Sequence, residues 1–308
     1  MNEDNSGKMD SVVEFFSRLG LVVKSPSSWW YEVQPKVFLS LPYYKTINPT
    51  EEEIRTLSHK YKLRAIRYPT SLNSFGFLSN ITINTNKNYD MSCLHQKARN
   101  QTRRGLENCE IKRIDFDFLY VNGLKLNKDT AARQERQSPF CDDIYWKKYC
   151  QAGKSTEGAS AWGAFVNNEL ASFLISLRTE DNWQEWVVNH SSTELRNKYP
   201  NNALVFTAVK HFFQNENCEG ICFGLGSLEE TEYLDHFKSR MGWVVQPIKQ
   251  RLIFSKSIEI LFSLAPERFL KLTNYIFPKS YFVRKTTAMI RLCKKQMYNV
   301  PVNLGDEA

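Results

Sequence analysis

The 308-residue sequence lacks any run of about 20 apolar residues, the length that a helix needs to cross a bilayer. Its nearest approach, residues 258–264, is soon interrupted by Pro266 and by two charged residues. The first ten residues are polar and acidic, unlike the basic and then apolar start of a secretory signal. We therefore expect a cytoplasmic protein without a transmembrane helix.

The seven cysteines form no CxxC pair, and no second cluster lies at the spacing of zinc ligands. An odd number of cysteines without a secretory signal indicates reduced thiols that pack as small apolar groups. The sequence also has no G-x-S-x-G motif and no cysteine with a suggestive neighbouring histidine. We expect no metal site and no covalent nucleophile.

The composition is that of a folded chain, with 42% hydrophobic and 13% aromatic residues. Its length is about twice that of a usual ~150-residue domain, which predicts two domains or one domain with a large extension. A net charge of +8 concentrates anionic ligands such as phosphates near the surface. The same charge is also typical of a soluble surface without a specific partner.

Aromatic and β-branched residues in the first third predict strands, at residues 29–41, 63–68 and 75–83. Between the first two, Thr50 and Glu53 form a capping box that predicts the start of a helix. A basic helix is predicted at residues 89–106, where Arg99 and Arg103 project together because they are four residues apart. These two arginines suit an anionic ligand or form a solvated face.

The pattern becomes sharper in the second half, after a strand predicted at residues 109–116. Strands at residues 161–166 and 170–178 are joined through Asn167 and Asn168, and asparagine tolerates the positive φ of tight hairpin turns. Further elements are predicted in the order strand 183–189, helix 203–214, strand 220–226, a helix that ends at Gly242, and strand 243–254. Strands mixed with helices in this order indicate a mixed α/β fold of the α+β class.

Three segments carry a family resemblance through their order and spacing: the basic run Lys97 to Gly105, the stretch Arg196 to Leu204, and Phe237 with Lys238 before Gly242. Together they resemble the GNAT acyltransferases, and most closely the Fem-type and related double-GNAT enzymes, which join an acyl group to an amine. The resemblance covers about half of the chain. It implies a central mixed sheet flanked by helices.

The resemblance implies three parts: a partial GNAT-like unit over residues 1–107, an acyltransferase domain over residues 108–255, and a helical tail over residues 256–308. It also places the loop for the acyl carrier before the helix at residue 203. That loop departs from the family pattern, because Tyr199 and Asn201 stand where glycines let backbone N–H groups approach a pyrophosphate.

Catalytic roles follow from the same resemblance. Lys238 would stabilise the oxyanion of the tetrahedral intermediate, and His190 or Glu185 would accept a proton from the amine. Each has a plain alternative: Lys238 pairs with Asp235, His190 is a hydrogen-bonded turn residue, and Glu185 faces solvent. The candidate carrier-binding residues are Arg196, Asn197, Lys198, Asn201 and Asn202, and the candidate substrate-binding residues are Arg99, Arg103 and Tyr233.

We therefore predict an N-acyltransferase that uses acyl-CoA, or a similar activated carrier, as co-substrate and an amine as acceptor. Two alternatives stay open: a Fem-type transferase with an aminoacyl-tRNA donor, and a non-catalytic GNAT-fold protein that binds RNA or another anionic partner. The basic and apolar tail either packs on the domain or contacts a membrane surface. The sequence predicts no oligomeric state.

Overall fold

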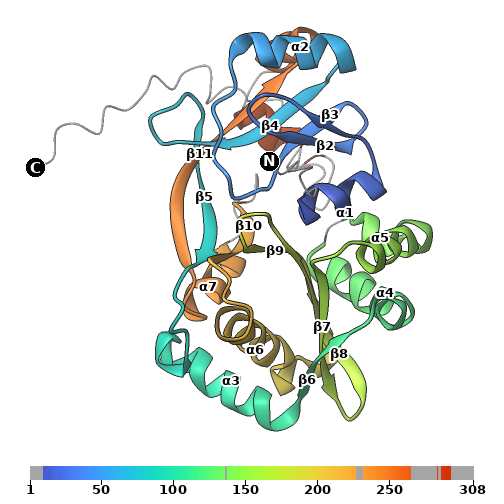
Figure 1. The fold of residues 1–308 in the computed structure, drawn as a ribbon, viewed down its shortest axis with the longest axis vertical. Helices are drawn as coiled ribbons and strands as arrows, with labels where there is room; N and C mark the ends of the chain where they lie inside the picture. Colours follow the sequence, from blue (N-terminus) through green and yellow to red (C-terminus); the bar gives the residue numbers. More distant parts are fainter. Residues whose placement is uncertain (1–9, 136, 227–231, 265–282, 284–285, 293–308) are drawn as a thin grey trace, which may run out of the picture.

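The computed structural model of this protein describes residues 10–135, 137–226, 232–264, 283 and 286–292 (Figure 1). The first part comprises α1 (Ser11–Leu19), β1 (Val22–Lys24), β2 (Trp29–Gln34), β3 (Val37–Leu41), α2 (Glu51–Tyr61), β4 (Ala65–Thr70), β5 (Phe77–Asn84), η1 (Met91–Cys93) and α3 (Gln96–Asn108).

The second part comprises β6 (Glu110–Ile114), α4 (Phe116–Arg133), η2 (Pro139–Cys141), α5 (Asp143–Ser155), β7 (Ala159–Val166), β8 (Glu169–Arg178), β9 (Trp183–Ser191), η3 (Glu194–Lys198), α6 (Pro200–Gln214), β10 (Gly220–Leu225), α7 (Glu232–Arg240), β11 (Val244–Phe254) and α8 (Lys256–Leu264). None of the described helices is long and apolar enough to span a membrane.

The described strands form one mixed sheet in the order β1-β2-β3-β4-β11-β5-β10-β9-β8-β7-β6. Strands from the two parts of the chain interleave at its centre, where β5 pairs antiparallel with both β10 and β11. The confirmed fold class is therefore mixed α/β. The domain boundary predicted after residue 107 remains a proposal, and the strands on its two sides share this sheet.

Local sequence signals account for several elements. Asn167 and Asn168 both have positive φ at the β7–β8 turn, which confirms the predicted hairpin. Gly242 has φ +78° after α7, the left-handed conformation expected there. The single strand predicted over residues 29–41 is wrong, because Lys36 takes φ +64° and turns the chain into the β2–β3 hairpin. Lysine itself gives no turn signal, but Pro35 directly before it does, because proline favours the first central position of a turn.

Helices cover the sheet on both faces (Figure 1). On one face α1, α4 and α5 enclose an aromatic core that includes Phe15, Trp146 and Phe173, all fully buried. On the other face α6 packs on β7, β8 and β9, and α3 lies along α6. The buried side of α6 is apolar through Leu204, Val209 and their neighbours, as its sequence pattern predicted.

The parallel strands β9 and β10 stay together over only three residue pairs, Trp183 to Glu185 with Gly220 to Cys222. Beyond them β10 pairs with β5 alone, and β9 pairs with β8 alone. The register between β8 and β9 shifts at this level, so that Val187 has no partner in β8. We call this divergence of β9 and β10 the fork.

The close packing of α3 on α6 depends on Gly105. A Cβ atom at this position would lie 2.6 Å from the Tyr199 carbonyl oxygen and 3.0 Å from the Ala203 Cβ. We expect Gly105→Ala to lower the free energy of unfolding by about 1–3 kcal/mol in chemical denaturation. Helix propensity alone would raise it by up to about 1 kcal/mol. A stabilised variant would therefore show that α3 does not press on α6.

A candidate active site at the fork of the sheet

Glu185 lies on β9 at the last residue pair before the fork, opposite Cys222 of β10. Its side chain is fully buried. One carboxylate oxygen, Oε1, accepts a hydrogen bond of 2.7 Å from the backbone N–H of Tyr43. The other, Oε2, is buried and has no hydrogen-bond partner within the described residues. A buried carboxylate with one unused oxygen is unusual in a core and is typical of a functional group.

Burial raises the pKa of Glu185 from 4.5 to about 8, because the charged form loses hydration. The Tyr43 N–H lowers that pKa, while the charges of Asp10 and Asp181 raise it. The carboxyl group therefore exchanges its proton near neutral pH. This is the range in which a general base is most effective.

Polar and aromatic groups from the first part of the chain surround Glu185. Burial raises the pKa of the Tyr43 phenol well above its normal value, and the Glu185 charge raises it further. Arg67 of β4 lies close enough to lower the Tyr43 pKa, and burial lowers the pKa of Arg67 itself to about 10. Its guanidinium donates to Gln250 Oε1 at 2.7 Å and to the Gly226 carbonyl at 3.2 Å.

Three aromatic rings meet at the fork, contributed by β9, β10 and the start of β11. Trp186, Phe223 and Trp243 have ring centroids 5.0 to 5.2 Å apart. The Nε1 atoms of Trp186 and Trp243 are buried and donate to no acceptor in the described chain. The Nζ atom of Lys238, on α7, lies 4.8 Å from the centre of the Phe223 ring.

Electrostatics connect the two groups of residues. Burial raises the pKa of the Cys222 thiol, the Glu185 charge raises it further, and the Lys238 ammonium lowers it. Glu185 and Lys238 therefore both act on the same thiol at the fork. Glu185 and Trp186 are consecutive on β9, so the two groups leave this strand on opposite faces of the sheet. Acyl transfer to an amine requires a proton acceptor and a cation, and these two groups meet only across the fork.

Comparisons with known proteins address the fold. No family model matches the chain, and no curated protein matches its sequence. Among solved structures, FemX is 12% identical with a TM-score of 0.56, covering 82% of this chain and 92% of that one. The C-terminal domain of a putative lysylphosphatidylglycerol synthetase from Agrobacterium fabrum is 12% identical with a TM-score of 0.54, covering 83% and 91%. The fold is therefore similar to that of FemX and of this synthetase domain.

L-PGS from Bacillus licheniformis is similar to the same extent, with 10% identity and a TM-score of 0.51 over 81% of this chain and 89% of that one. At identities this low, the comparisons show a similarity of fold alone. The chemistry must be inferred from the residues of this chain. In this chain the fork lies between β9 and β10, one strand away from β5 of the first part.

His190, the other predicted base, lies in the aromatic core on the α4 side of the sheet. Its Nδ1 atom is 2.6 Å from Asn127 Oδ1, and its ring packs edge-on against Phe140 and Phe173. It is 5% exposed. The structure thus places Glu185 and Lys238 at the fork and His190 in a packed, hydrogen-bonded position.

The predicted carrier-binding residues lie around the start of α6. Arg196, Asn197 and Lys198 are exposed on η3, directly before the helix. Tyr199 provides no side-chain cap, so the first N–H groups of α6 have no side-chain acceptor from that residue. By contrast, Asn202 is buried and its Nδ2 atom lies 3.5 Å from the Met241 sulfur.

Among the remaining carrier-binding and substrate-binding candidates, Asn201 lies on α6, and Arg99 and Arg103 lie on α3. Asn201 is within 3.4 Å of the Ser172 hydroxyl. Arg99 donates from Nη2 to the carbonyls of Ser92 and Leu94, and so braces the turn before its own helix. Arg103 is exposed on α3. The side chain of Tyr233 lies outside the described residues, as do Ser227 to Glu230 of the predicted capping box.

Several residues of the site carried no signal in the sequence. Tyr43 and Arg67 come from strands and turns of the first part, and Trp186 and Trp243 were assigned only to strands. The two tryptophans could have been found only by expecting two parallel strands to diverge beside a buried carboxylate. Among the described residues, no group of three or more His, Cys, Asp or Glu side chains could hold a metal ion.

Proposed function

We propose that the protein transfers an acyl or aminoacyl group from an activated carrier to an amine, and that the reaction takes place at the fork. The observation that carries this proposal is Glu185, a buried carboxyl with a pKa of about 8 and one oxygen that accepts no hydrogen bond from the described residues. An amine acceptor must lose a proton in the reaction, and this group is tuned to accept it near neutral pH.

The residues divide the reaction between them. Deprotonated Glu185 takes a proton from the amine as its nitrogen attacks the acyl carbonyl. The carbonyl π electrons move to oxygen, and the ammonium of Lys238 stabilises the resulting oxyanion. When the carbonyl re-forms, the bond to the carrier breaks and the carrier leaves with the electron pair. The new amide and the released carrier then balance the step.

Two kinds of group near the fork suit the acyl donor. The indole N–H groups of Trp186 and Trp243 are buried and have no hydrogen-bond acceptor in the described part of the chain. The carbonyl oxygens of an acyl donor would provide such acceptors. The exposed Arg196 and Lys198 and the start of α6 favour phosphates. An acyl-CoA and an aminoacyl-tRNA share both features.

The test is a transfer assay with both classes of carrier. The purified protein is incubated with labelled acyl-CoAs of different chain length, or with labelled aminoacyl-tRNAs, and with a panel of primary amines. We expect amide product from one class, with a matching rise in melting temperature when that carrier alone is added. If no carrier gives an amide product and none raises the melting temperature, the proposed function is refuted.

We expect Trp186→Phe and Trp243→Phe each to weaken donor binding about fivefold, since each removes one hydrogen bond worth about 1 kcal/mol. Titration calorimetry with the donor identified in the assay measures the change. Trp162→Phe is the matched control, because Trp162 Nε1 is also buried without an acceptor among the described residues but packs against His211. Equal weakening by all three variants would show a general packing effect.

A non-catalytic RNA-binding function gains less from the structure. Of the basic residues that would serve it, Lys112 pairs with Glu110 at 2.9 Å and Arg113 pairs with Glu216. Arg103 and Arg104 are exposed on α3. An affinity for RNA that falls steeply with salt and depends on Arg103 would support that function.

A further inference from the structure

Strand β6 ends the sheet, and only one of its edges is occupied. It pairs antiparallel with β7 from Glu110 to Ile114, and no described strand pairs with its outer edge. In an antiparallel pair, half of the residues of an edge strand direct their N–H and C=O groups away from the sheet. An extended peptide can add to such an edge by main-chain hydrogen bonds.

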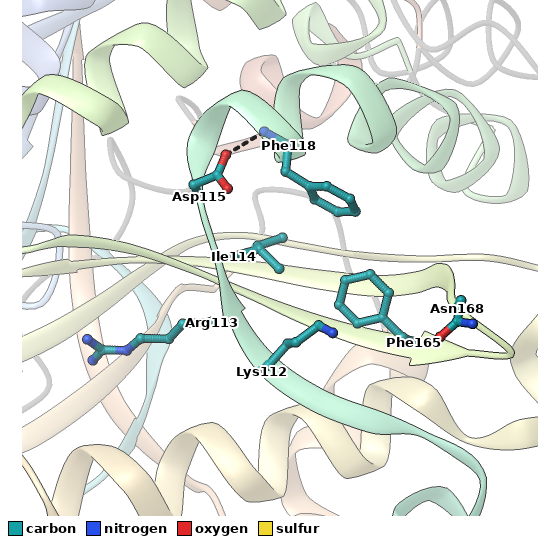
Figure 2. Close-up of a pocket in the computed structure, with 7 residues that line it drawn as sticks. All are labelled: Lys112, Arg113, Ile114, Asp115, Phe118, Phe165 and Asn168. Atoms are coloured by element: carbon teal, nitrogen blue, oxygen red, sulfur yellow. Dashed lines mark hydrogen bonds between the residues drawn. The ribbon is translucent and has the colours of Figure 1, made fainter.

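The two faces of this edge differ in chemistry. Figure 2 shows Lys112 directed toward Phe165 and Arg113 directed the other way, with Ile114, Phe118 and Asn168 near Phe165. On this side a pocket of about 390 Å³ has Ile114, Phe118 and Phe165 among its lining residues. This face suits an apolar side chain.

Glycine allows the apolar wall to form. A Cβ atom at Gly163 would lie 2.9 Å from the Phe165 ring and 3.2 Å from Ile114, so the ring folds over the glycine beside β6. The Lys112 ammonium lies 4.7 Å from the centre of the same ring. The pocket therefore has an aromatic wall and a cation at its rim.

The opposite face is polar and basic. The Arg113 guanidinium lies 5.2 Å from the Trp162 ring, pairs with Glu216, and borders a pocket of about 580 Å³ that also contains Ser160 and Arg178. The lining thus has two arginines and one glutamate. The Ser160 hydroxyl is buried without a hydrogen-bond partner, and Arg178 forms no ion pair, both judged within the described residues. This face suits an acidic side chain.

A second copy of β6 would not pair well with this edge. In an antiparallel pair centred on Lys112, two lysines would lie directly opposite each other, which is destabilising. The ion pair of Lys112 with Glu110 is exposed and contributes little, so Lys112 can readily contact another carboxylate. The edge therefore favours a partner of opposite charge over self-association.

We propose that the outer edge of β6 binds an extended acidic peptide of a partner protein by strand addition. Successive residues of such a strand point to opposite faces. An apolar residue enters the pocket of Ile114, Phe118 and Phe165, and the acidic residues beside it in the sequence face Arg113. This surface is separate from the fork, and the proposal does not depend on the transfer reaction.

The test uses a fluorescently labelled synthetic peptide in which glutamate alternates with valine around a central phenylalanine, with anisotropy as the readout. We expect saturable binding that weakens as salt increases. Replacing the central phenylalanine by serine should weaken binding about tenfold, and N-methylation of alternate amides should abolish it. A lysine-for-glutamate version of the peptide should not bind.

The matched protein variant is Arg113→Glu, which changes the residue that the acidic side chains face and whose own side chain is 51% exposed. It should lose at least tenfold in affinity for the glutamate peptide and gain affinity for the lysine peptide. No saturable binding at concentrations up to about 1 mM would overturn the proposal. Equal binding of the N-methylated peptide would also overturn it, because strand addition requires those N–H groups.

Discussion

Glu185→Gln is expected to lower the rate of acyl transfer by about two to four orders of magnitude, the usual loss when a positioned general base is removed. Glutamine keeps the acceptor for the Tyr43 N–H, which now reaches Glu185 Oε1 at 2.7 Å. It also matches the volume of the protonated side chain. The fold should therefore remain while the proton acceptor is lost.

The dependence of the rate on pH distinguishes this role from a purely structural one. With a pKa of about 8, Glu185 is mostly protonated at pH 7, so the wild-type rate should rise with pH and level off above pH 8. The residual rate of Glu185→Gln should lack this rise. Glu180→Gln, at an exposed position on the β8–β9 turn, serves as the control and should keep the wild-type profile. A Glu185→Gln variant with the wild-type rate would exclude Glu185 as the base.

Local signals in the sequence predicted much of the second part of the fold. The asparagine pair at the β7–β8 turn and Gly242 after α7 act through backbone conformations that few other residues adopt readily. The apolar stripe of α6 has a period that fits only a helix packed against a surface. Each of these signals lies within a few residues of the element that it specifies.

The arrangement of the site depends on contacts between distant residues, and these leave no local pattern. Tyr43 contacts Glu185 across 142 positions of the sequence. At the fork the pairing of β9 with β10 ends, while β10 continues to pair on its other edge with β5 from the first part of the chain. The family resemblance indicates Glu185 and Lys238, but only the structure shows that Tyr43 contacts Glu185, that Arg67 lies near Tyr43, and that Trp186 packs on the ring beside Lys238.

His190 shows the limit of reasoning from chemical type. A histidine near the end of a strand that borders the expected cleft is a reasonable base by its usual pKa. Alternation along β9 and packing by Phe140 and Phe173 bring it instead into the core, against Asn127. Burial raises the pKa of Glu185 into the range that an exposed histidine would occupy. Burial at the fork thus makes a carboxyl group suitable as the general base, a role that the sequence alone would assign to a histidine.

The same pKa shift predicts that Glu185 makes the protein less stable at alkaline pH. Its pKa is about 8 in the folded protein and 4.5 in an exposed carboxyl, so folding takes up a proton between these pH values. The contribution of Glu185 to stability is complete below pH 4.5 and is lost progressively as the pH rises to about 8. The total loss is on the order of 5 kcal/mol.

Glu185→Gln should remove this dependence, because glutamine does not titrate. We expect the variant and the wild type to have similar free energies of unfolding at pH 5, and the variant to be the more stable of the two at pH 9. Urea denaturation at the two pH values measures the difference, and comparing the variants cancels the titration of all other groups. Parallel stability profiles would mean that Glu185 titrates alike in the folded and unfolded chain. In that case the carboxyl would carry its charge at neutral pH, and its burial would not be what tunes it as a base.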